Sequence, residues 1–93
     1  MWNDLVFIFS DDHAVRAVSA YGDSLVETPN IDRIAASGVR FDRAYVGNAI
    51  CGPSRATLLT GMHSHANGFY SNEWSGPFDG EQQTLSNLLQ GAG

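Results

Sequence analysis

The 93-residue sequence contains no lysine, a single cysteine and no apolar run of the roughly 18 residues that a membrane-spanning helix needs. Its basic residues are five arginines, outnumbered by ten acidic residues, so the net charge is −5. This balance argues against a nucleic-acid-binding protein, which would carry a basic stripe. One cysteine excludes an internal disulfide framework and a cysteine-rich zinc site. The first residues carry no positive charge, so no signal peptide is visible.

The apolar runs and turn residues predict an α/β fold. Residues 5–9 are apolar at every position, which is typical of a strand buried on both faces of a parallel sheet, and residues 39–46 are expected to form a second strand. Helices are expected to start at Val15, Pro29, Pro53 and Thr84 and to end at Gly22, Gly38, Gly61 and Gly91. Thr28 and Thr84 are the expected N-caps, and residues 62–83 are expected to form a long surface loop. Because two strands leave a sheet face without partners, we expect residues 1–93 to be the N-terminal part of a larger domain with a mainly parallel sheet flanked by helices.

Two adjacent acids, Asp11 and Asp12, follow the first predicted strand. Ligands gather beyond the carboxyl ends of strands in open α/β sheets, and carboxylate oxygens suit Ca²⁺ or Mg²⁺. The alternative is a solvated turn in which an aspartate caps the following helix. The pair alone leaves both interpretations open.

Cys51 directly precedes the predicted helix that starts at Pro53. A lone cysteine is usually a small buried apolar residue. The free N–H groups and dipole of a helix N-terminus favour an anion, however, and Arg55 lies one turn further on. A cysteine phosphatase would need five residues between its cysteine and arginine, whereas three intervene here. This spacing weakens the interpretation of Cys51 as a thiolate nucleophile.

Four segments together resemble one enzyme family. Cys51-Gly52-Pro53-Ser54-Arg55, followed by Leu59-Thr60-Gly61, resembles the signature C-x-P-S-R-x-x-x-L-T-G of the formylglycine-dependent sulfatases, which belong to the alkaline-phosphatase-like superfamily. The run from Val6 to His13 resembles the opening strand and paired metal aspartates of that family. Thr28-Pro29-Asn30-Ile31-Asp32-Arg33 with Gly38-Val39-Arg40-Phe41, and the tail from Gln83 to Gly93, resemble further family segments in the same order.

The resemblance implies a specific chemistry. Cys51 would be oxidised to formylglycine by a formylglycine-generating enzyme or an anaerobic maturase, and one hydroxyl of its hydrate would attack sulfur. Asp11, Asp12 and residue 51 would bind a divalent cation, Ca²⁺ or Mg²⁺, which neutralises sulfate oxygens. Arg55 would hold the hydrate and stabilise developing charge. Asp11, Asp12 and residue 51 are therefore expected to converge at one end of the sheet.

The lysine, histidines and second pair of metal ligands of the family are expected from later segments, because this chain has no lysine. His13 is expected to make a hydrogen bond in the turn that follows it. His63 and His65 are expected to have local structural roles. Asn72-Glu73-Trp74 could border the substrate cleft.

The opening segment and the Gln82-Gln83-Thr84 region look closest to carbohydrate sulfatases, including the heparan type, so the implied substrate is a sulfated sugar. A phosphonate or phosphodiester hydrolase, which can share the formylglycine motif, and a non-catalytic truncated product are the alternatives. The family resemblance implies a periplasmic, secreted or lysosomal location.

Overall fold

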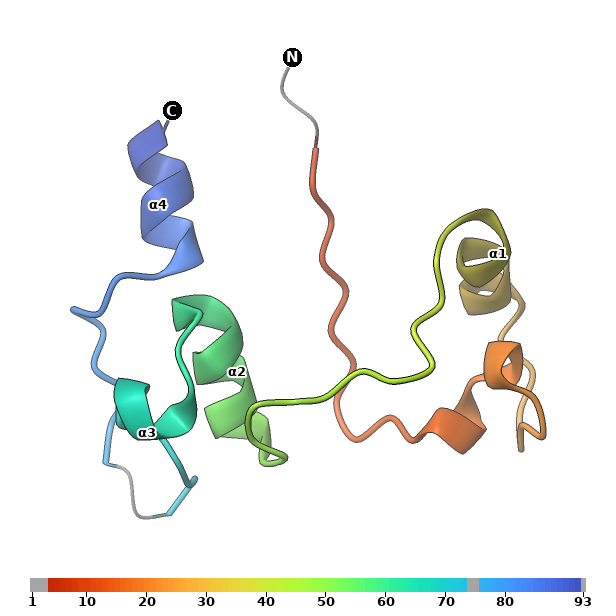
Figure 1. The fold of residues 1–93 in the computed structure, drawn as a ribbon, viewed down its shortest axis with the longest axis horizontal. Helices are drawn as coiled ribbons and strands as arrows, with labels where there is room; N and C mark the ends of the chain where they lie inside the picture. The colour runs from red at the N-terminus through yellow and green to blue at the C-terminus, as the bar shows by residue number, and fades with distance from the viewer. Residues whose placement is uncertain (1–3, 74–75, 93) are drawn as a thin grey trace. The chain divides into compact units, whose positions relative to one another are not determined.

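The computed structural model describes residues 4–73 and 76–92 (Figure 1). The chain divides into two compact units, Met1–Ala44 and Tyr45–Gly93. Within the described ranges, no helix combines the length and the apolar character that crossing a membrane requires.

The first unit contains two short 3₁₀ turns, η1 (Val15–Ala17) and η2 (Ser19–Tyr21), and helix α1 (Pro29–Ser37). The single helix expected from Val15 onward is therefore wrong. The backbone N–H of Ser19, which an α-helix would pair with the carbonyl of Val15, instead donates to Thr28 Oγ1 at 3.0 Å. Val18 is extended as a result, and Gly22 ends the second turn with a φ of 82°. Helix α1 begins at Pro29 and stops before Gly38, as predicted.

A polar cluster joins η2 to the start of α1. Ser19 Oγ donates to Asp32 Oδ2 at 2.5 Å, and Thr28 Oγ1 donates to Asp32 Oδ1 at 3.0 Å. Thr28 is the N-cap residue of α1, as predicted, and its carbonyl accepts the N–H of Asp32 at 2.9 Å, but its side chain makes no capping hydrogen bond to the helix backbone. The Thr28 hydroxyl donates to the carboxylate of Asp32 instead. Asp32 lies in the first turn of α1, where the helix dipole favours a negative charge.

Arg40 connects the segment after α1 to η2 through side-chain contacts. Its guanidinium donates to Asp42 Oδ1 at 2.7 Å and to the carbonyl of Ala20, and it lies 5.1 Å from the ring centroid of Tyr21. The hydrogen bond to Asp42, and next its negative charge, raise the pKa of Arg40. The Tyr21 hydroxyl completes the connection by donating to the carbonyl of Phe41 at 3.1 Å.

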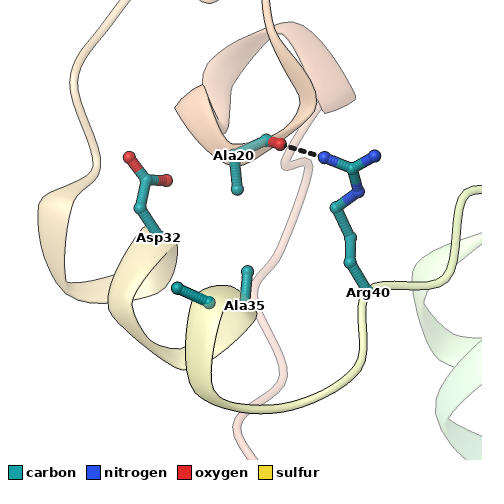
Figure 2. Close-up of a pocket in the computed structure, with 5 residues that line it drawn as sticks. Ala20, Asp32, Ala35 and Arg40 are labelled. Carbon is teal, nitrogen blue, oxygen red and sulfur yellow. Dashed lines mark hydrogen bonds between the residues drawn. The ribbon is translucent and has the colours of Figure 1, made fainter.

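A pocket of about 430 Å³ lies in this unit. Figure 2 shows two residues that line it, Asp32 and Arg40, on opposite sides of the small residues Ala20 and Ala35. Both charged groups already have partners within the unit, Asp32 in Ser19 and Thr28 and Arg40 in Asp42. We therefore read this pocket as part of the packing between η2 and α1 rather than as a catalytic site.

The second unit contains helices α2 (Cys51–Thr60), α3 (Ser64–Asn67) and α4 (Leu85–Ala92). Helix α2 begins at Cys51, two residues before the predicted start at Pro53. It ends as predicted at Gly61, which is left-handed (φ 69°) and donates its N–H to the carbonyl of Thr57 at 2.9 Å. The predicted surface loop at residues 62–83 is interrupted by α3.

Helix α4 begins with a reciprocal cap. Thr84 Oγ1 accepts the backbone N–H of Asn87 at 3.3 Å, and Asn87 Oδ1 accepts the backbone N–H of Thr84 at 3.0 Å. This is the geometry of a capping box with asparagine at the third position, and it confirms Thr84 as the N-cap. The helix continues through Gly91, its predicted end, to Ala92.

The predicted sheet is not confirmed, because the residues that the structure describes contain no strand. Residues 5–9 are exposed instead, with Val6 at 80% and Ile8 at 81%, and Tyr45 in the second predicted strand is 92% exposed. A strand forms only when its N–H and C=O groups pair with a neighbour, and parallel pairing requires segments distant in sequence. The fully apolar pattern of residues 5–9 signals burial, but the described residues supply no neighbour that buries them.

We expect the isolated 93-residue chain to be only marginally stable. Among the described residues only Pro53, Ala56, Ser64 and Asn67 are buried, all in the second unit, and large apolar side chains are exposed along both units. The chain should therefore bind the dye ANS strongly and lose its helical circular-dichroism signal over a broad temperature range. A sharp cooperative transition without dye binding would contradict this expectation.

Candidate active site

Cys51 is the first residue of α2, and its side chain is exposed. Ile50, the N-cap, is extended (φ −105°, ψ 139°) and provides no side-chain cap, although its carbonyl accepts the N–H of Ser54 at 2.8 Å. The N–H groups of the first turn have no acceptor further back in the helix, and the helix dipole adds positive potential there. Cys51 thus lies where a negatively charged group would be stabilised.

One face of α2 is buried and the opposite face is exposed. Pro53 is fully buried and Ala56 is 3% exposed, and the helix packs against α3. Since successive helical residues are rotated by about 100°, Cys51 and Arg55 lie on the face opposite these two buried residues. Arg55 is exposed and follows Cys51 by four residues, the spacing that makes helix side chains neighbours. Cys51 and Arg55 therefore share the exposed face of α2, and their action at one site stays a prediction.

Asn48 holds the chain that enters α2. Its Oδ1 accepts the backbone N–H of Ile50 at 3.1 Å, and its Nδ2 donates to Ser64 Oγ at 3.1 Å and to the carbonyl of Tyr70 at 3.2 Å. One amide side chain thus connects the N-cap of α2 to the start of α3 and to the segment that follows α3. This role was not predictable from the sequence, because Ser64 and Tyr70, which accept from the amide of Asn48, lie 16 and 22 residues away.

Residues 69–72 lie against the first turn of α2. Asn72 Nδ2 donates to Cys51 Sγ at 3.1 Å, and a Cβ atom added to Gly52 would lie 2.4 Å from Asn72 Oδ1 and 2.8 Å from the Phe69 ring. Asn72 therefore contacts residue 51 directly, and its place at the border of a substrate cleft stays a prediction. Trp74, named in the same expectation, lies outside the described residues.

Asp11 and Asp12 belong to the first unit, where both are exposed after the extended residues 5–9. Asp12 has a positive φ of 46°, which turns the chain sharply at this point. Across the described ranges, no group of three His, Cys, Asp or Glu residues could hold a metal ion. The convergence of the two aspartates on Cys51 stays a prediction.

The histidines have local partners. His13 Nε2 lies 3.0 Å from the carbonyl of Ala17, which confirms the predicted hydrogen bond in the following turn. The rings of His63 and His65 stack with centroids 5.9 Å apart and an interplanar angle of 10°, at the start of α3.

The sequence match decides the family: residues 3–93 match the sulfatase family. The chain belongs to the sulfatase family. It is 52% identical over 97% of its length to an N-acetylglucosamine-6-O-sulfatase of Bacteroides thetaiotaomicron, and 37% identical over 97% of its length to the human N-acetylgalactosamine-6-sulfatase. It spans 16% and 19% of the lengths of these sulfatases. No solved structure matches the chain.

Membership confirms the resemblance carried by the signature at residues 51–61. It also implies, for the family in general, a formylglycine in place of the signature cysteine and a divalent metal. The hydrogen-bond donors around position 51 in the second unit fit a formylglycine at that position. An exposed side chain at position 51, beside first-turn N–H groups and the amide of Asn72, is in a place where oxygen atoms would find hydrogen-bond donors.

Replacing Asn48 by alanine should destabilise the site region. The substitution leaves the N–H of Ile50 and the buried hydroxyl of Ser64 without this partner, which should lower the free energy of unfolding of the complete gene product by about 1–2 kcal/mol. Chemical denaturation measures this loss. Asn30→Ala, at an exposed position of α1, serves as the control and should change stability by less than about 0.5 kcal/mol. Equal stability of the two variants would contradict the bridging role of Asn48.

Proposed function

We propose that the complete protein hydrolyses sulfate esters of a sulfated carbohydrate, with residue 51 as formylglycine and Ca²⁺ as the metal. The observation that carries the proposal is the first turn of α2, which exposes Cys51 and Arg55 on one face within a chain of the sulfatase family. The site would lie at the N-terminus of this helix.

The residues of the second unit suit a sulfate group. A sulfate ester carries negative charge on oxygens that the free N–H groups and the dipole of α2 would attract. The guanidinium of Arg55 offers paired donors in a plane, a geometry that matches two oxygens of a tetrahedral anion. These fixed donors would stabilise the charge that grows as the ester bond breaks. Formylglycine, when present at position 51, supplies a hydroxyl nucleophile in its hydrated form.

The two aspartates of the first unit are our candidates for the metal ligands. Asp11 and Asp12 provide hard carboxylate oxygens, which Ca²⁺ binds in sets of six to eight. A bound ion would supply positive charge beside the sulfate oxygens. Since no complete ligand group occurs among the described residues, the remaining ligands would come from other parts of the protein.

We propose a 6-O-sulfated N-acetylhexosamine as the substrate class. The support is the similarity to the relatives named as N-acetylglucosamine-6-O-sulfatase and N-acetylgalactosamine-6-sulfatase, of which the first is 52% identical to this chain. We also propose that a formylglycine-generating enzyme or anaerobic maturase acts on Cys51, and that the protein works in the periplasm, in a lysosome or outside the cell.

Cys51→Ala should abolish sulfate ester hydrolysis in the complete protein. Alanine cannot be converted to formylglycine, so the nucleophile is lost, while a residue exposed at the helix surface contributes little to folding. Mass spectrometry of the peptide containing Cys51 should show the aldehyde or its hydrate in active wild-type protein. Fully active enzyme with an unmodified thiol would refute the proposed nucleophile. Faster turnover of phosphonate or phosphate diesters than of sulfated sugars would favour the alternative hydrolase.

Removing the divalent metal should abolish activity reversibly. Dialysis against a chelator followed by Ca²⁺ should restore turnover, with Mg²⁺ less effective, because flexible carboxylate sites with many oxygen ligands favour the larger ion. Asp11→Asn and Asp12→Asn should each raise the Ca²⁺ concentration needed for half-maximal activity by at least about tenfold, since each removes a negative charge from the ligand set. Asp23→Asn, elsewhere in the first unit, is the control. Full activity of the chelated protein would contradict the metal proposal.

A further inference from the structure

The amide of Asn72 touches the side chain that the proposed function makes the nucleophile. Asn72 Nδ2 lies 3.1 Å from Cys51 Sγ, although the two residues are separated by 21 positions in the sequence. Cys51 is exposed, so this contact does not arise from general burial of the side chain. The contact therefore has the character of a specific hydrogen bond.

Gly52 provides the room for this contact. A Cβ atom at position 52 would lie 2.4 Å from Asn72 Oδ1 and 2.8 Å from Phe69 Cε1, closer than real Cβ atoms approach other atoms. Position 52 is the variable position of the C-x-P-S-R signature, so the signature itself does not require glycine there. The steric reason for glycine in this chain is the close approach of Asn72 and Phe69.

The segment that carries Asn72 is fixed from its other end. The backbone N–H of Phe69 donates to Asn67 Oδ1 at 2.8 Å, and Asn67, only 4% exposed, donates to the carbonyl of Met62 at 3.0 Å. The ring of Phe69 makes an edge contact with that of Phe78 at 6.2 Å between centroids. The amide thus approaches Cys51 from a supported segment.

We propose that Asn72 is a positioning residue of the active site, whose amide, seated over Gly52, holds the side chain of residue 51 in one orientation. An amide N–H donates weakly to the sulfur of cysteine and more strongly to an oxygen that replaces it. A side chain with three staggered χ1 positions is thereby restricted to the one within reach of the donor. Orientation of a nucleophile affects the rate of the chemical step more than substrate affinity. The inference rests on the proposed function only in taking residue 51 as the nucleophile.

The test compares Asn72→Ala and Asn72→Asp in the complete protein, with rates normalised to the formylglycine content measured by mass spectrometry. Alanine removes the amide, whereas an ionised aspartate keeps its shape but cannot donate. Both variants should lower kcat about tenfold or more and change KM by less than about twofold. Gly52→Ala should lower kcat in the same way, because its methyl group displaces the Asn72 amide. Gly80→Ala, whose added Cβ meets nothing within 4 Å, is the matched control and should keep the wild-type kcat.

A second measurement does not depend on activity. Crystal structures of the protein produced without maturation should show one Cys51 rotamer hydrogen-bonded to Asn72 in the wild type, and several or shifted rotamers in Asn72→Ala. Wild-type kcat in Asn72→Asp, or an unchanged single Cys51 rotamer in Asn72→Ala, would overturn the positioning role. Sulfate hydrolysis by Cys51→Ala would instead overturn the proposed function and leave the rotamer result standing.

Discussion

The arrangement of the second unit depends on which face of α2 is buried. Pro53 and Ala56 are withdrawn from solvent on one face, and this fixes the rotation of the helix about its axis. Because helical residues are rotated by about 100° each, burial of these two leaves Cys51 and Arg55 exposed on the other face. Proline is tolerated here because the N–H it lacks, in the first turn, would have no intrahelical acceptor. The burial of Pro53 and Ala56 and the exposure of Cys51 and Arg55 thus follow from the same rotation of the helix.

Amide side chains, more than apolar packing, connect the segments around this helix. Asn48 bonds to the N-cap, to α3 and to the segment after it, and the buried Asn67 bonds to Met62 and Phe69. The carbonyl of Asn67 also accepts the side-chain N–H of Gln82 at 2.8 Å. Hydrogen bonds are directional, so they fix the position of a loop more narrowly than apolar contact of the same area. A unit with few buried apolar residues can therefore still present its polar groups in defined places.

The sequence predicted the features that neighbouring residues determine. The end of α2 at Gly61 and the cap of α4 at Thr84 depend on residues within four positions, and both were confirmed. The sheet, the partner of Thr28 and the contact of Asn72 with Cys51 depend on residues far apart in the chain, and periodicity carries no record of such pairs. The apolar pattern of residues 5–9 predicted a buried strand, whereas these residues are exposed in the structure, because a pattern cannot supply the neighbouring strand. Cys51 and Arg55 could be named from the sequence because one signature contains both, and their roles in the site stay predictions.

The structure gives four of the first five positions of that signature a physical reason in this chain. Cys51 and Arg55 share the exposed face, four residues apart, where both can face one anion. Pro53 lies on the buried face, so any larger or polar residue there would disturb the packing that sets the helix rotation. Gly52, on the flank between these faces, meets the segment that carries Asn72. Since neighbouring segments approach this flank, a larger residue at position 52 would require Asn72 and Phe69 to move, so the identity of this residue depends on what packs against it.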